Sequence, residues 1–207
     1  MPSRRGPTLK LDKGRLGVLC LETTEWDPDR PDNRMSTRPL LALLERDEAV
    51  RSIYRDIATR AELGHYLERW RTTRRGNLRR YSFLYLPFHG SEHPGGIDVE
   101  DGEVTVAWIG NQLKGRCAGT QVHFSSCGTL DLDARRIDAF RTRIGAAVVT
   151  GYTEDVGWLD SAVVDLMLMS RLQRHRGRVD LALRGLRDDA DALLNRLGFI
   201  VSPSTLQ

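Results

Sequence analysis

Short apolar segments alternate with longer amphipathic segments along most of this chain, and this order constrains the fold more than any other feature. The apolar segments have the length of buried strands, and the segments between them carry apolar side chains at helical spacing. Strands separated by helices of about ten to fifteen residues favour parallel pairing, with helices on both faces of the sheet. We therefore expect an α/β fold with three layers and a mainly parallel sheet. The predicted strands cover residues 16–21, 49–57, 81–87, 121–124, 146–150 and 199–201. The predicted helices cover residues 38–47, 59–75, 133–142, 161–173 and 180–197. A hairpin with strands at 97–99 and 103–108 precedes a short helix that starts at 109.

Composition places the chain among ordinary globular proteins. Of its 207 residues, 40% are hydrophobic and 29% are charged, and we expect one domain over residues 1–207 with a flexible N-terminal tail at 1–14. No apolar run approaches the ~18 residues that a membrane-spanning helix needs, and the basic N-terminus lacks the apolar segment of a signal peptide. These features predict a cytoplasmic protein that does not associate with a membrane.

Two classes of partner are not expected. The formal net charge is only +3, and aromatic residues are not interleaved with the arginine clusters, so the pattern does not favour nucleic-acid binding. No glycine-rich phosphate-binding loop follows the first predicted strand, and no cofactor is expected.

Two reactive side chains follow two of the predicted strands. His89 follows the strand at 81–87, and Cys127 follows the strand at 121–124. The carboxyl ends of parallel strands meet at one edge of a sheet, where binding sites form. A cysteine attacks as its thiolate, and a nearby imidazole can take the thiol proton. The pair therefore predicts a cysteine nucleophile with its base, although each residue taken alone is more simply the end of a strand.

The residues around this pair suit acyl transfer. Gly90 has no side chain, so its backbone N–H can approach a bound carbonyl, and the N–H of Cys127 can supply a second donor to an oxyanion. Ser125, Ser126 and Gly128 are small and leave room for a peptide beside the cysteine.

The order and context of these motifs resemble the caspase-like cysteine peptidases of clan CD, and most closely their bacterial CHAT-like branch. The resemblance spans residues 16–172 and rests on the motifs at 84–90, 122–130, 145–152 and 160–162. It implies a three-layer caspase-like fold, His89 as general base and acid, Cys127 as nucleophile, and the Gly90 and Cys127 amides as the oxyanion hole. It also implies a protein substrate, an activating partner protein and a role in bacterial defence.

The specificity of such an enzyme is not expected to be that of a caspase. Ser125 and Ser126 stand where caspases have glutamine and alanine, and no caspase-like arginine follows the first strand. Acidic residues in the loops near the cysteine would suit a basic substrate side chain, which predicts cleavage after arginine or lysine. Asp160 can equally be read as a helix cap. The predicted substrate-binding residues are Glu22, Glu25, Tyr152, Glu154, Asp155, Trp158 and Asp160.

Other histidines and cysteines have simpler interpretations. His123 is predicted to be a packed strand residue and His93 a solvated loop residue, while Cys20 belongs to the core and Cys117 has no evident partner. The alternative to an enzyme is a catalytically silent caspase-like scaffold that binds a partner protein.

Overall fold

A mainly parallel sheet forms the centre of the protein. The computed structural model describes residues 6–23, 35–72 and 80–206. Within them, six strands form one sheet in the order β2-β1-β3-β7-β8-β9, in which β9 alone is antiparallel to its neighbour. A second, antiparallel sheet has the order β4-β5-β6. The strands are β1 (Leu16–Thr23), β2 (Val50–Ile57), β3 (Phe83–Leu86), β4 (His89–Gly90), β5 (Gly96–Val99), β6 (Gly102–Thr105), β7 (Gln121–Phe124), β8 (Val148–Tyr152) and β9 (Phe199–Ser202).

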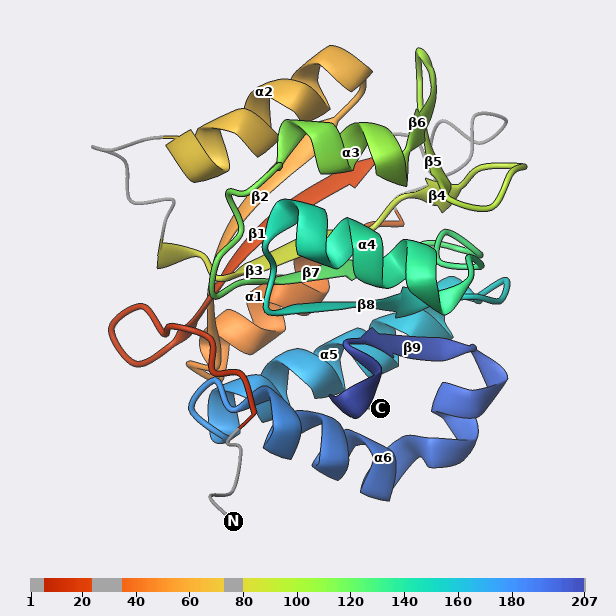
Figure 1. The fold of residues 1–207 in the computed structure, drawn as a ribbon. Helices are drawn as coiled ribbons and strands as arrows, with labels where there is room; N and C mark the ends of the chain where they lie inside the picture. Colours follow the sequence, from red (N-terminus) through yellow and green to blue (C-terminus); the bar gives the residue numbers. More distant parts are fainter. Residues whose placement is uncertain (1–5, 24–34, 73–79, 207) are drawn as a thin grey trace.

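Helices cover both faces of the main sheet. Helices α1, α5 and α6 pack on one face, and α2, α3 and α4 pack on the other (Figure 1). The expected three-layer α/β architecture with a mainly parallel sheet is therefore confirmed. The α-helices of the described residues are α1 (Arg38–Arg46), α2 (Arg60–Thr72), α3 (Val106–Gln112), α4 (Ala134–Ile144), α5 (Trp158–Arg174) and α6 (Val179–Arg196).

Strand β1 explains why the apolar segments are continuous rather than alternating. It is buried along its whole length. Val18 and Cys20 belong to the apolar cluster under α1, α5 and α6, whereas Leu19 and Leu21 belong to the cluster under α2, α3 and α4. A central strand between two helical layers needs apolar side chains on both faces, so its sequence loses the period of two.

The structure differs from the sequence prediction after the hairpin. Residues 106–108 were expected in a strand, but they form the first turn of α3. The side chain of Thr105 accepts a hydrogen bond from the backbone N–H of Trp108 and caps this helix. A threonine cap satisfies one of the free N–H groups of the first turn, which favours a helix start at this point.

Residues 6–14, which the sequence analysis placed in a flexible tail, make contacts with the rest of the domain. Leu9 is buried, and its N–H donates to the carbonyl of Gly177 at 2.9 Å. Thr8 forms a bridge with Arg178. Across the described residues, no helix is long and apolar enough to cross a membrane.

Candidate active site

The ends of β3 and β7 bring His89 and Cys127 to the same edge of the main sheet. The two strands are parallel, and Leu86 pairs with Phe124 at their last position. His89 follows Leu86 by three residues, and Cys127 follows Phe124 by three residues. The sequence-based expectation that these strand ends lie side by side is confirmed.

Gly90 and Cys127 make a close backbone contact. A Cβ atom built on Gly90 would lie 1.8 Å from the carbonyl oxygen of Cys127 and 2.8 Å from its carbonyl carbon. Real Cβ atoms do not approach backbone atoms so closely, so only glycine fits here without moving the chain. The glycine after the histidine therefore sets how near the two loops come.

A cavity of about 180 Å³ lies between these loops and the first turn of α5. Both His89 and Cys127 line it, together with Tyr85, Ser125 and Thr37. The rest of its wall is largely apolar. The apolar side chains that line it are Met35, Pro87, Phe88, Val156, Trp158 and Ala162.

The sulfur of Cys127 lies against the loop between β8 and α5. The backbone N–H of Val156 donates to the Cys127 Sγ at 3.4 Å, and the carbonyl of Val156 lies 3.4 Å from the same sulfur and can accept the thiol proton. These two backbone contacts hold the sulfur against the loop that precedes α5. Cys127 is also partly exposed, whereas Cys20 is buried and burial raises the pKa of its thiol well above the usual value.

The structure brings one of the predicted substrate-binding residues into the cavity. Trp158 lines it, and its indole Nε1 is buried without a hydrogen-bond partner among the described residues. Glu25 lies outside the residues that the structure describes. Glu154 and Asp155 are exposed and do not line the cavity.

The other three predicted substrate-binding residues have structural partners. Glu22 is buried and holds the start of α1, because its carboxylate accepts hydrogen bonds from the Thr37 N–H at 2.6 Å and the Ser36 hydroxyl at 2.7 Å. Burial raises the pKa of Glu22, and these hydrogen bonds oppose the rise. Asp160 lies within the first turn of α5 and pairs with Arg196 at 3.0 Å, so it neither caps the helix nor lines the cavity.

Tyr152 is fully buried and belongs to a polar cluster that the sequence analysis missed. This cluster centres on Asp165 of α5, a buried carboxylate. Its Oδ1 accepts from Tyr152 at 2.7 Å and from His123 Nε2 at 2.7 Å. Its Oδ2 accepts from Tyr85 at 2.6 Å and from Ser125 at 2.5 Å. Both oxygens are therefore occupied by protein donors.

The Asp165 cluster fixes two side chains that line the cavity, Tyr85 and Ser125. Burial alone would raise the pKa of Asp165, but the adjacent His123 and the donated hydrogen bonds outweigh it, and the pKa lies below its usual value. Burial and the Asp165 charge hold the pKa of Tyr85 well above its usual range, so this hydroxyl stays a donor. The one signal in the sequence was a carboxylate inside an apolar stretch of a predicted helix.

The two other histidines for which the sequence made a prediction lie as expected. His123 is packed within β7, although its two hydrogen bonds to Asp165 and Thr150 give it a polar role that packing alone did not suggest. The His93 side chain is 79% exposed. Within the described residues, no three His, Cys, Asp or Glu side chains are grouped as metal ligands would be.

Comparison with known proteins identifies the family but no activity. The chain matches the model of a family of unknown function (DUF6642) over residues 16–201 and belongs to that family. No curated protein sequence matches the chain.

Proposed function

We propose that this member of a family without an assigned function is a cysteine endopeptidase, in which His89 and Cys127 hydrolyse a peptide bond. The observation that carries the proposal is that both side chains line one cavity at the carboxyl ends of two adjacent parallel strands. The three-layer fold is the one that the resemblance to caspase-like peptidases implies, and it supports that relationship. The proposal includes a protein substrate.

The chemistry follows from the two side chains. The Cys127 thiolate attacks the substrate carbonyl, and the imidazolium of His89 gives its proton to the departing amine as the C–N bond breaks. Water then attacks the thioester with His89 as the base, which releases the carboxylic acid and restores the thiol. The N–H of Val156 lies 3.4 Å from the attacking sulfur and helps to fix its position.

The oxyanion is assigned to the backbone amides of Gly90 and Cys127. The close backbone approach at Gly90 supports this role, because it places the two residues directly beside each other. Preorganised N–H donors stabilise the charge that develops on the carbonyl oxygen and typically contribute about 3–4 kcal/mol each.

The cavity favours an apolar substrate side chain over the basic one predicted from the sequence. Among the described residues, the acidic side chains on which that prediction rested lie outside the cavity wall. Asp165 and Glu22, which hydrogen-bond to residues that line the cavity, are buried and already accept hydrogen bonds from the protein. A lysine or arginine side chain would thus enter a largely apolar space in which the described residues offer no free anion, and burying an unpaired charge is costly.

Alkylation with iodoacetamide tests the dyad without knowledge of the substrate. We expect Cys127 to react much faster than a free thiol near pH 7, and Cys20 and Cys117, which are buried in the same chain, to serve as internal controls. His89→Ala should remove the excess reactivity. The matched control is His65→Ala, which removes an exposed histidine of α2 that does not line the cavity and should have little effect.

The opposite result would favour the scaffold alternative. If Cys127 reacts at the rate of an ordinary exposed thiol, and His89→Ala does not change that rate, the dyad is not formed and the peptidase proposal is wrong. Peptide mapping by mass spectrometry identifies which cysteine carries the label.

A further inference from the structure

The small sheet after β3 places two carboxylates in a row with His89. In the β4–β5 ladder His89 is paired with Asp98, and in the β5–β6 ladder Asp98 is paired with Glu103. Directly opposed residues of an antiparallel pair project on the same face, with Cβ atoms about 4.5–5.5 Å apart. The three side chains therefore form a cross-strand row, His89–Asp98–Glu103, that starts at the imidazole of the dyad.

Gly96 gives independent evidence that this row shares one face. Gly96 precedes Asp98 by two residues and so lies on the same face of β5. A Cβ atom built on Gly96 would lie 2.7 Å from Glu103 Oε1 and 2.0 Å from Ser91 Oγ. The Glu103 side chain therefore folds over β5 on the face that carries Asp98.

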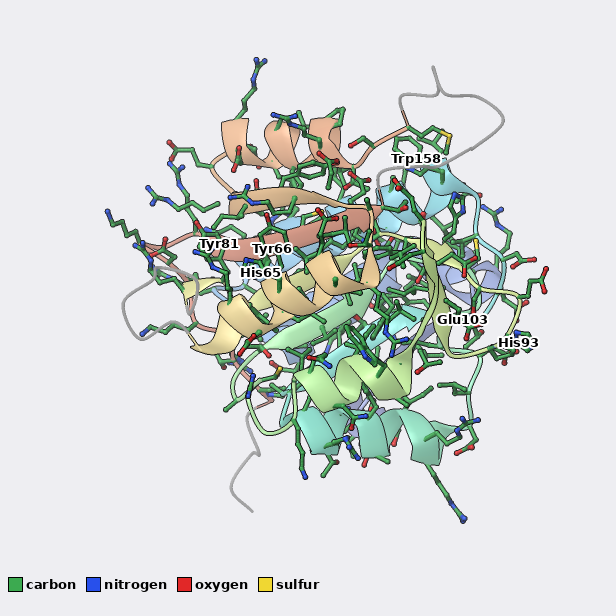
Figure 2. The ribbon with its side chains drawn as sticks, turned by 90° about the horizontal axis from the view of Figure 1, so that it is seen from above. His65, Tyr66, Tyr81, His93, Glu103 and Trp158 are labelled. Carbon is green, nitrogen blue, oxygen red and sulfur yellow. The ribbon has the colours of Figure 1, made fainter. Side chains whose placement is uncertain are left out.

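A second imidazole, that of His93, lies next to Glu103 at the other end of the row. His93 Nδ1 lies 3.6 Å from Glu103 Oε2, and Figure 2 shows the two side chains beside each other at the end of the hairpin. His93 thus contacts Glu103 on the solvent-exposed side of the row.

The charges in the row act on one another. Burial raises the pKa of Asp98, the negative charge of Glu103 raises it further, and the nearby His89 lowers it, while Glu92 adds a smaller upward effect. Asp98 and His89 are therefore close enough to influence each other. Asp165, the carboxylate behind the cavity, is engaged with His123 instead.

We propose that Asp98 is a positioning residue that orients His89 and stabilises its imidazolium form, with Glu103 as the second carboxylate of the row. This role rests on the proposed function, because it requires His89 to act in the dyad. An imidazole held by a carboxylate keeps its orientation and its proton.

The pH dependence has a defined sign. Because the pKa of Asp98 is raised, Asp98 loses its charge at a higher pH than an ordinary carboxyl group. Its support for His89 is present above that pH and disappears as the pH falls through it. The groups that set this transition are Glu103 on β6, His89 on β4 and Glu92 in the connecting loop.

The test measures the rate of Cys127 alkylation by iodoacetamide from pH 4 to pH 9 in the full chain. We expect Asp98→Asn to lower the alkylation rate at pH 7 by about three- to tenfold. The reason is that one nearby charge shifts the pKa of a partly exposed group by about half to one unit. Asp98→Glu should restore most of the rate. The matched control is Glu100→Gln, which removes an acidic side chain of the same hairpin outside the row.

An electrostatic role also has a salt signature that a merely structural role lacks. The difference between wild type and Asp98→Asn should shrink in 1 M NaCl, because salt screens the partly exposed pair. Thermal unfolding of each variant reports whether the fold is intact.

The outcomes separate this inference from the proposed function. If wild-type Cys127 reacts rapidly, His89→Ala abolishes that reactivity and Asp98→Asn matches wild type at every pH, the dyad stands and the role of Asp98 is refuted. The same refutation follows if Glu100→Gln has an effect as large as Asp98→Asn. If wild-type Cys127 shows no excess reactivity, the proposed function itself fails.

Discussion

Asp165→Asn removes the charge at the centre of the buried cluster while keeping the size of the side chain. Asp165 accepts four hydrogen bonds, two on each oxygen. A hydrogen bond to a charged group contributes roughly 1 kcal/mol more than a neutral one, so four bonds lose about 4 kcal/mol in total. A neutral amide is easier to bury, which offsets part of this loss. We expect a net destabilisation of about 2–4 kcal/mol, a large share of the ~5–15 kcal/mol typical of a folded protein.

The assay is equilibrium unfolding in urea at pH 7, analysed as the free energy of unfolding in water. Asp160→Asn is the matched control, because it makes the same chemical change in the same helix at a partly exposed pair with Arg196. Exposed pairs of this kind contribute about 0–1 kcal/mol. The reasoning is refuted if Asp165→Asn destabilises the protein by no more than Asp160→Asn does.

Three further predictions concern backbone contact, pH and specificity. Gly90→Ala should destabilise the protein by about 1–3 kcal/mol and abolish rapid Cys127 alkylation, because its Cβ would collide with the Cys127 carbonyl; an unchanged alkylation rate would contradict the close contact. Because the pKa of Asp165 lies below its usual value, its contribution to the free energy of unfolding should be present above about pH 4 and decline as the pH falls through the lowered pKa. Urea unfolding measured across pH should show this component in wild type but not in Asp165→Asn. A panel of peptides varied at P1 should be cleaved at least about tenfold faster with leucine, methionine or phenylalanine than with lysine or arginine; a basic preference would restore the prediction made from the sequence.

The order of strands and helices was predictable because each kind of element has its own pattern of apolar residues in the sequence. Central strands are apolar on both faces, and β1 has this property over its whole length. The placement of His89 and Cys127 followed from the same reasoning, since parallel strands end at one edge. What these two residues do was a chemical inference from their types, and it remains a proposal.

The lining of the cavity could not be predicted in the same way. Glu22 occupies the expected strand end, but its carboxylate binds the start of α1 rather than facing the cavity. Which partner a carboxylate takes depends on the packing of distant segments, and the partners of Glu22 are Ser36 and Thr37, which follow it by 14 and 15 residues in the sequence. Sequence position alone therefore located the loops near Cys127 but not the directions of their side chains.

The sequence predicted only part of the row that includes Asp98. The turn at Asp101 and Gly102 predicts a hairpin. With those two residues in the loop Asp98 would pair with Thr105, but in the structure Glu100 and Asp101 form the loop and Asp98 pairs with Glu103. The pairing of Asp98 with His89 depends on a longer connection, for which no local turn sets the register. The structure was needed to place the hairpin beside His89.

Covalent trapping by a peptidyl acyloxymethyl ketone with leucine at P1 tests the central claim most directly. This reagent needs both recognition of a peptide and an activated thiolate, and intact-mass spectrometry counts the adducts. We predict one adduct per chain, located on Cys127, that is lost in Cys127→Ala and strongly slowed in His89→Ala. Modification that is absent in folded wild type, or that persists equally in His89→Ala, would contradict the assignment of His89 and Cys127 as a catalytic dyad.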